Sequence, residues 1–256
     1  MSILEIQDVS MRFGGLVAVS DFNLWLDKGD LVGLIGPNGS GKTTVFNIIS
    51  GFYEPTAGTV YFDGRDTAGL RPDERVALGM ARIFQNSRLF GSLTVLDNIM
   101  VSYHVRLRSS LLGAIVRTPN YVHQERQAHE ESVTLLAQLG LANVIHEQAA
   151  SLPYGLQRKV EVARALATKP QLLLLDEPTT GLSAEETSEM MDFILAIRSD
   201  FELTVLLIEH TMRVVMGCCP RILVLNYGRT IAQGTPGEIQ GNPDVIQAYL
   251  GEDGNA

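Results

Sequence analysis

The sequence feature that most constrains the fold is a glycine-rich loop placed between a short apolar segment and a helical one. Residues 31–35 (LVGLI) are nearly all apolar, as in a strand that is buried on both faces of a parallel sheet. The loop at residues 36–43 (GPNGSGKT) follows directly and matches the pattern G-x-x-x-x-G-K-[ST]. A helix is predicted from about Gly41 to Ser50, with Gly51 as its stop. The order of strand, loop and helix is the context that this pattern requires, and it predicts an α/β fold.

The same loop predicts a binding site for nucleotide phosphates. Glycines let the backbone wrap closely around an anion and point N–H groups inward, and the helix N-terminus adds a partial positive charge. The ammonium group of Lys42 is suited to the β- and γ-phosphates, and the Thr43 hydroxyl is suited to Mg²⁺. A glycine-rich turn without function is the alternative, and the Lys-Thr pair at this spacing disfavours it. The predicted nucleotide contacts are Gly36, Pro37, Asn38, Gly39, Ser40, Gly41, Lys42, Thr43 and Thr44.

Two further apolar strands end in side chains that can do chemistry. Residues 172–175 (LLLL) lead into Asp176 and Glu177, and residues 204–208 (TVLLI) lead towards His210. Ligands of open parallel sheets bind at the carboxyl ends of the strands, so we expect these side chains to meet the loop at one edge. Asp176 is suited to hold Mg²⁺, and Glu177 is suited to polarise an attacking water as general base. Each acid alone could equally be a surface or helix-capping residue.

Two further side chains complete the candidate catalytic set. His210 could contact the γ-phosphate and the water, although a lone histidine is more often structural. Gln85 follows the segment 80–84 (MARIF) and could reach Mg²⁺ and the water as a neutral ligand. Glutamines at strand ends are ordinary. Chemistry alone therefore favours a catalytic role and an ordinary structural role for Gln85 about equally.

The rest of the chain divides into a β-rich start, a helical middle and a returning α/β pattern. Alternation over residues 22–27 predicts β structure near the N-terminus. From about residue 93 to 166 the apolar residues recur at helical spacing. We therefore expect one domain over residues 1–256, with a helical subdomain at about 90–165 inserted into it. The segment at about 107–121 is predicted to be an extra elaboration within that subdomain.

Composition excludes several classes of protein. The formal net charge of −9 argues against nucleic acid as a partner, because phosphate backbones require a basic surface. No segment approaches the roughly 20 apolar residues of a membrane-spanning helix. The start of the chain (MSILEI) lacks the basic and apolar parts of a signal peptide. These observations predict a protein of the cytoplasm with no transmembrane segment of its own.

The ordered set of motifs resembles that of ABC-type ATPases from end to end. The set contains the phosphate loop, Gln85, residues 152–157 (LPYGLQ) in the signature position, residues 172–177, the loop 181–183 (GLS) and His210. The resemblance implies a P-loop NTPase fold, which has a RecA-like core with a mostly parallel sheet, an N-terminal antiparallel β subdomain and an inserted α-helical subdomain.

The resemblance also implies the cofactors and the roles of the site residues. ATP and Mg²⁺ are expected, with Thr43, Gln85 and Asp176 at the metal and with Glu177, His210 and Gln85 in catalysis. Phe13 would stack on adenine, and a core aromatic at a strand end is the alternative for this residue. The resemblance further implies a head-to-tail dimer, in which each ATP lies between one subunit's phosphate loop and the other subunit's signature segment.

A narrower resemblance connects the chain to the ATP-binding subunits of branched-chain amino acid importers. It is carried by residues 11–19, 51–53, 88–90, 207–210 and 242–251, together with Thr118-Pro119. It implies a peripheral protein on the cytoplasmic face of the inner membrane, with two permease subunits, a second ATPase subunit and, indirectly, a substrate-binding protein as partners. Related systems for urea or amide import or for lipopolysaccharide-type export share several of these segments and stay as alternatives.

Two further alternatives are disfavoured by the sequence. Soluble ABC ATPases that act on ribosomes usually carry two ATPase copies in one chain, and those that act on DNA carry a long coiled coil or a zinc hook. This chain has one copy of the motifs and no Cys-x-x-Cys. A nucleotide-binding regulator without turnover is disfavoured because Lys42, Asp176, Glu177 and His210 are all present.

The signature segment departs from the family pattern. The family has serine, glycine and glutamine where this chain has Pro153, Tyr154 and Leu156. Proline suits the first position of a helix but has no hydroxyl to hold the opposite γ-phosphate. We therefore predict an unequal pair, in which this chain's loop works with the intact signature of a different ATPase subunit. The segment predicted to face the partner's ATP, and to support only slow hydrolysis, comprises Pro153, Tyr154, Gly155, Leu156 and Gln157.

Overall fold

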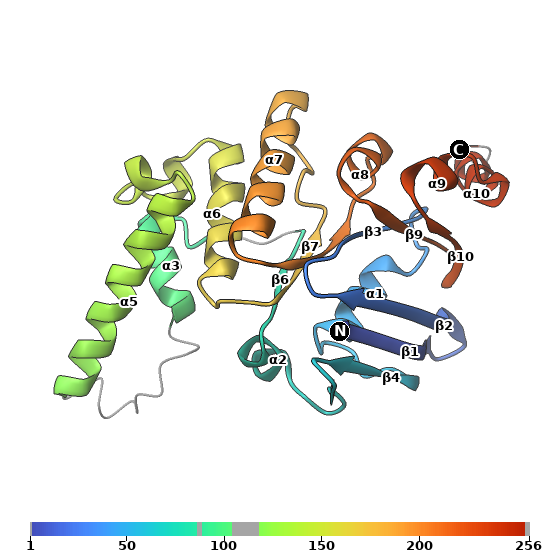
Figure 1. Cartoon of the computed structure of the whole chain (residues 1–256), viewed down its shortest axis with the longest axis horizontal. Helices are drawn as coiled ribbons and strands as arrows, with labels where there is room; N and C mark the ends of the chain where they lie inside the picture. The colour runs from blue at the N-terminus through green and yellow to red at the C-terminus, as the bar shows by residue number, and fades with distance from the viewer. Residues whose placement is uncertain (1, 86–88, 104–117, 254–256) are drawn as a thin grey trace. The chain divides into compact units, whose positions relative to one another are not determined.

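Contacts divide the chain into two compact units, one discontinuous and one continuous (Figure 1). The computed structural model describes residues 2–85, 89–103 and 118–253. The first unit joins residues 1–85 to residues 171–256, and the second unit comprises residues 86–170. The second unit is therefore inserted in sequence between two parts of the first.

A six-stranded sheet forms the centre of the first unit, with the strands in the order β10-β9-β3-β8-β7-β6. All neighbouring pairs are parallel except β10 with β9. Every residue of β3, β7 and β8 is buried, which explains why these strands are continuous apolar runs in the sequence. The strands are β3 (Leu31–Ile35), β6 (Met80–Ile83), β7 (Leu172–Asp176), β8 (Thr204–Ile208), β9 (Arg221–Asn226) and β10 (Arg229–Gly234).

A second, antiparallel sheet is built mainly from the N-terminal residues, in the order β2-β1-β4-β5. Its strands are β1 (Ser2–Phe13), β2 (Leu16–Asp27), β4 (Ala57–Phe62) and β5 (Arg65–Asp66). Helix α1 (Lys42–Ile49) shares one buried core with both sheets through Val45, Phe46, Ile48 and Ile49. The helix that follows the phosphate loop is thus held by apolar side chains from two sheets.

The remaining helices of the first unit surround this core, and two of them show the capping chemistry expected from their sequences. Ser183 and Thr235 each form a capping box with the glutamate three residues later, at the starts of α7 and α9. The helices are α2 (Pro72–Leu78), α7 (Ala184–Asp200), α8 (Met212–Cys218), α9 (Pro236–Gln240) and α10 (Pro243–Asp253).

Helix α8 approaches the central strand β3 at a glycine. A Cβ atom built on Gly33 would lie 2.6 Å from Val215 Cγ1 and 3.3 Å from Cys219 Sγ. A larger residue at position 33 would therefore require the side chains of Val215 and Cys219, or the segment that carries them, to shift. Cys218 and Cys219 lie at the end of α8, and their sulfur atoms are 3.5 Å apart.

The second unit is helical in the residues that the structure describes. It contains α3 (Val95–Tyr103), α5 (Pro119–Gln138) and α6 (Tyr154–Leu166), with short 3₁₀ turns at Ala142–Val144 and Ala149–Ser151. The two sheets and this helical insertion confirm the predicted fold class. Of the elaboration predicted at 107–121, residues 107–117 lie outside the described residues, and Thr118 caps the start of α5 through Tyr121 N–H.

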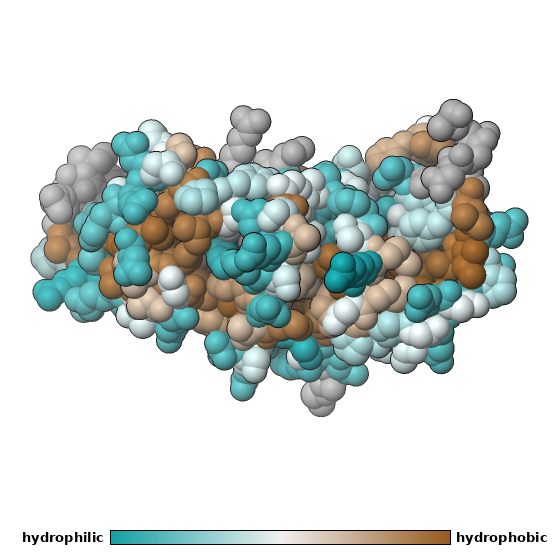
Figure 2. Space-filling model, turned by 90° about the horizontal axis from the view of Figure 1, so that it is seen from above, coloured by the Kyte–Doolittle hydropathy of each residue, from teal (hydrophilic) through white to brown (hydrophobic). Residues whose placement is uncertain are grey.

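The surface is mixed rather than uniformly polar. Figure 2 shows one face of the molecule, on which hydrophilic residues are spread between smaller apolar areas. Large exposed apolar side chains include Leu16, Trp25, Phe52 and Leu250. Among the described residues, no helix is both long enough and apolar enough to cross a membrane.

Candidate active site

The phosphate loop is shaped by backbone conformations that favour glycine. Gly36 has φ +150°, and a Cβ atom there would lie 2.0 Å from the carbonyl oxygen of Leu225. Gly41 has φ +107°, and a Cβ atom there would lie 2.7 Å from the carbonyl oxygen of Ala18. Both positions combine close backbone approach with a left-handed conformation, so a side chain would displace the loop. The loop leads into α1, whose first residue is Lys42.

Lys42 is buried and bends back over the loop that precedes it. Its Nζ atom donates to the carbonyl oxygens of Gly36 and Pro37 at 2.7 and 2.8 Å, and its distance to Ser40 Oγ is 3.4 Å. These contacts hold the ammonium group against the backbone of the loop. A positive charge held there, next to the N-terminus of α1, suits the negative charge of phosphate groups.

Asp176 ends β7 as a buried carboxylate in an ion pair. Its Oδ2 atom accepts from Arg82 Nη2 at 2.7 Å, and both side chains are less than one-tenth exposed. Burial raises the pKa of the Asp176 carboxyl, while the bond from Arg82 acts in the opposite direction. The pairing of Asp176 with an arginine was not predicted from the sequence.

Glu177 receives contacts from three side chains that come from different parts of the chain. Its Oε2 atom accepts from Gln85 Nε2 at 2.6 Å and from Thr180 Oγ1 at 3.1 Å. His210 Nδ1 lies 3.6 Å from the same oxygen. The backbone N–H of Glu177 bonds to the carbonyl of Ile208 at the end of β8, with φ +50° at Glu177. The structure thus brings together the three predicted catalytic residues Gln85, Glu177 and His210.

Strand order explains this convergence. The loop follows β3, His210 follows β8, Gln85 follows β6, and Glu177 follows Asp176, the last residue of β7. These four strands are consecutive neighbours in the sheet and are parallel, so their carboxyl ends lie along one edge. The predicted meeting of strand ends is therefore present in the structure.

Glu209 is a further carboxylate of this edge. It is 1% exposed, and its Oε1 atom accepts from the backbone N–H of Thr179 at 3.0 Å and from the Thr179 hydroxyl. Its Oε2 atom lies 3.8 Å from His210 Nδ1. Glu209 therefore connects the end of β8 to the loop after Glu177. An acidic residue directly after a buried strand was the sequence signal for it.

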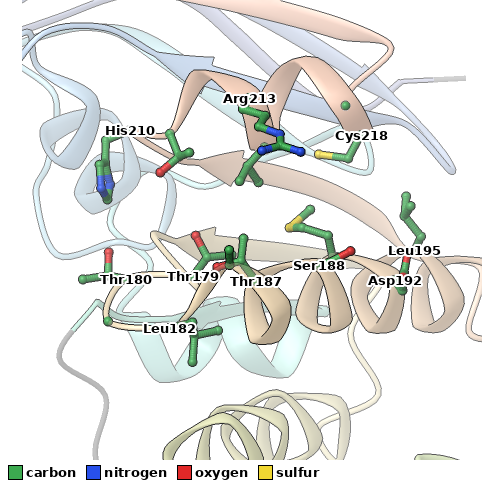
Figure 3. A pocket seen from close by; sticks show the side chains of 16 residues that line it. Thr179, Thr180, Leu182, Thr187, Ser188, Asp192, Leu195, His210, Arg213 and Cys218 are labelled. Carbon is green, nitrogen blue, oxygen red and sulfur yellow. The ribbon is translucent and has the colours of Figure 1, made fainter.

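A cavity of about 600 Å³ opens beside this edge, between α7 and α8 (Figure 3). Thr179, Thr180 and His210 line one part of it, and Asp192, Arg213 and Cys218 line another. Because Thr180 and His210 also contact Glu177, the cavity adjoins the candidate catalytic carboxylate.

Phe13 ends β1 with a side chain that is 41% exposed and meets Tyr53 edge-on, with ring centroids 5.2 Å apart. Phe13 pairs with Leu16 across the β1–β2 hairpin, and the Ala18 carbonyl on the same hairpin faces Gly41. The hairpin thus runs beside the start of α1. The exposed ring of Phe13 offers an apolar, aromatic surface of the kind on which a planar base stacks.

These residues fit ATP and Mg²⁺ by their chemistry. The loop offers a glycine cradle and a buried ammonium group, and Thr43 is exposed in the first turn of α1. No group of three or more His, Cys, Asp or Glu side chains that could hold a metal occurs within the described residues. Mg²⁺ commonly uses one or two protein oxygens and completes its shell with phosphates and water. The side chains suited to supply these few protein oxygens to Mg²⁺ are those of Thr43, Asp176 and Gln85.

The signature segment belongs to the second unit and starts α6. Pro153 occupies the cap position of α6, one residue before the first helical residue. Tyr154 is 44% exposed, and its hydroxyl accepts from Arg158 Nη2 at 2.6 Å. Arg158 also donates to Glu161 Oε2 at 2.8 Å. Gln157 Nε2 donates to the carbonyl of Leu152.

Comparisons with known proteins agree with this arrangement. A family model described as ABC transporter matches residues 19–180, and one described as Branched-chain amino acid ATP-binding cassette transporter matches residues 229–255. The high-affinity branched-chain amino acid transport ATP-binding proteins LivG of Escherichia coli (strain K12) and BraF of Pseudomonas aeruginosa are each 44% identical to this chain over 250 residues, which is 98% of both chains. The crystal structure of the ADP conformation of MJ1267, an ATP-binding cassette of an ABC transporter, is similar with a TM-score of 0.86 at 29% identity, covering 98% of this chain and 99% of that one.

Proposed function

This chain belongs to the ABC transporter family of ATP-binding proteins, and we propose that it powers the import of branched-chain amino acids. ABC ATPases couple ATP hydrolysis to transport across a membrane. Support for the substrate comes from the two curated relatives, which are similar over nearly the whole chain, and from the family model at residues 229–255.

One observation supports hydrolysis rather than binding alone. The Glu177 carboxylate lies at the sheet edge that carries the phosphate loop, and it is contacted by Gln85, Thr180 and His210. A carboxylate oriented by three neighbours from different segments is well held for general-base work on one water molecule. In this proposal the loop and Lys42 bind the β- and γ-phosphates, Glu177 takes the proton of the attacking water, and His210 orients that water and the γ-phosphate.

Mg²⁺ would neutralise charge on the phosphates while it is bound. In our proposal Thr43 and Asp176 hold it, with Gln85 at its remaining side, and Phe13 stacks on adenine. The position of Gln85 next to Glu177 supports a role for this residue near both the metal and the water.

We further propose the assembly in which this subunit works. Pro153 supplies no side-chain hydroxyl at the signature, so the partner ATPase subunit is expected to be a different chain with an intact signature. Two permease subunits would hold the ATPase pair at the cytoplasmic face of the membrane, and a substrate-binding protein would deliver the amino acid to them.

Purification from membranes combined with an uptake assay tests this proposal. A tagged copy of the chain, extracted from its own cells in mild detergent, should bring with it a second, different ATPase subunit and two permeases, identified by mass spectrometry. Cells that lack the gene should lose uptake of labelled leucine and regain it with the wild-type chain. An unrelated tagged protein from the same cells is the control. Recovery of a single permease type, together with unchanged leucine uptake in the deletion strain, would contradict import and favour export.

A further inference from the structure

Arg82 links two elements of the candidate site from a buried position on β6. Its Nη2 atom donates to Asp176 Oδ2 at the end of β7, at 2.7 Å. Its Nη1 atom donates to Asn47 Oδ1 at 2.7 Å and to Ser50 Oγ at 3.0 Å, and both of these residues belong to or end α1. One guanidinium group therefore bonds to the strand that carries Asp176 and to the helix that begins at the phosphate loop.

Aromatic rings restrict the orientation of this guanidinium group. The Arg82 Cζ atom lies 4.4 Å from the ring centroid of Phe84 and 5.4 Å from that of Phe46. Phe84 in turn meets Phe52 edge-on, with ring centroids 5.4 Å apart. A planar group that contacts rings and bonds at both nitrogens of its fork has little freedom to rotate.

Stability alone explains this arrangement poorly. Removing two charges from water costs several kcal/mol per ion, and buried ion pairs are often no more stabilising than apolar residues of similar volume. Burial lowers the pKa of the Arg82 guanidinium, which is the expected sign of that cost. A buried pair that contributes little net stability is better explained by the geometry that it imposes.

The geometry concerns the two residues proposed to hold Mg²⁺. Thr43 lies in the first turn of α1, and Asp176 is the last residue of β7. These elements come from distant parts of the sequence, and Arg82 bonds to both. Because Arg82 uses Oδ2 of Asp176, its bonds also orient the other carboxylate oxygen.

We propose that Arg82 is a positioning residue that fixes the Asp176 carboxylate relative to α1 and thereby sets the spacing of the Mg²⁺ ligands. This inference rests on the proposed function of Thr43 and Asp176. The simpler alternative is that Arg82 only neutralises a buried acid, in which case a lysine would serve as well. Lysine keeps the charge but has no planar fork with which to hold Asp176 and Asn47 together.

The test compares Arg82→Lys with a matched buried arginine. Arg75 is 2% exposed, and among the described residues it donates to the backbone carbonyls of Ile48, Ile49, Thr67 and Leu70. Arg75→Lys therefore disturbs a buried arginine of the same unit without touching Asp176. For each purified variant, ATP affinity is measured by calorimetry with Mg²⁺ and with EDTA, and the ratio of the two affinities gives the contribution of Mg²⁺.

Arg82→Lys should reduce this ratio about 10-fold, as is typical when a group that orients a metal ligand is changed, with ATP affinity in EDTA unchanged. Arg75→Lys should lower the midpoint of urea unfolding and leave the ratio at the wild-type value. Asn47→Ala keeps the ion pair but removes one bond to α1, so it should reduce the ratio less than Arg82→Lys. The double variant Asn47→Ala, Ser50→Ala removes both bonds to the α1 region and is the deciding variant if Arg82→Lys does not fold.

Three outcomes would overturn the proposal. A wild-type ratio in Arg82→Lys would leave Arg82 only a charge-neutralising role. A wild-type ratio in the double variant Asn47→Ala, Ser50→Ala, which removes both bonds from Arg82 to the α1 region, would show that these bonds have no part in positioning. If Arg75→Lys lowered the ratio as much as Arg82→Lys, the effect would come from a general loss of rigidity in the unit and not from the bonds of Arg82. Failure of the proposed metal site itself is distinguishable, because the wild-type protein would then show no effect of Mg²⁺ on ATP affinity.

Discussion

The carboxyl edge of the parallel sheet and the signature segment of α6 are built in opposite ways. At the sheet edge, the contacts join residues far apart in sequence, such as Arg82 with Asp176 and Gln85 with Glu177. At the signature segment, Tyr154 bonds to Arg158, four residues further along the same helix. The bonds of the first region join residues in or just after different strands of the sheet, whereas this bond of the second region joins two turns of one helix.

This difference has a consequence for how each region tolerates change. Residues at the sheet edge are held by several strands at once, so altering one of them disturbs the chemistry of the others. At the signature segment, the bonds from Arg158 to Tyr154 and Glu161 join residues of the same helix, and none of these three residues belongs to the sheet. The two regions are therefore expected to respond to mutation on very different scales.

The largest effect is expected at Glu177. Glu177→Gln keeps the size of the side chain but removes the base, and general-base catalysis commonly contributes about 10²- to 10⁴-fold. ATP turnover should fall by at least about 100-fold, with ATP still bound, because the loop and Lys42 are unchanged. Turnover is measured by phosphate release and binding by calorimetry. A variant with near wild-type turnover would exclude Glu177 as the base.

An intermediate effect is expected from restoring the signature. The double variant Pro153→Ser, Leu156→Gln reintroduces a hydroxyl and an amide, and a hydrogen bond to a charged group contributes about 1.5 kcal/mol or more. ATP turnover of the assembled transporter should rise by up to about tenfold at the site that this segment completes. The control Pro153→Ala, Leu156→Ala removes the proline without adding a donor and should give no rise. Unchanged turnover in the serine–glutamine variant would contradict the unequal pair.

The smallest effect is expected at Tyr154. Tyr154→Phe removes the acceptor of the bond from buried Arg158, and because Tyr154 is 44% exposed, water can replace part of that bond. The free energy of unfolding should fall by about 1 kcal/mol, measured by urea denaturation. Tyr227→Phe is the control, because Tyr227 is 87% exposed and should show no loss. An equal loss in both variants would mean that the bond to Arg158 adds no stability.

The sequence predicted the strands of the sheet edge well, for a physical reason. Strands β3 and β8 have the predicted bounds, and β7 begins at the predicted residue, because a strand buried on both faces must be apolar throughout. The apolar run of β3 stops at Gly36, and the apolar run of β7 stops at Asp176. Motif spacing also indicated which side chains would meet, since parallel strands deliver their ends to one edge.

The sequence did not predict the contacts that depend on three-dimensional pairing. Arg82 and Asp176 are 94 residues apart, and nothing local in residues 80–84 indicates that this arginine reaches two other elements. The order of the strands in the sheet is likewise a property of the whole fold. The bond between Thr179 and Glu209 was missed for the same reason, although both residues follow predicted strands.

Gly33 has an effect that extends beyond its own strand. The absence of a side chain there lets Val215 and Cys219 of the α8 region rest directly on β3. His210 lies two residues before α8 and its Nδ1 atom is 3.6 Å from Glu177, so a larger residue at position 33 is expected to alter the site through the packing of that helix.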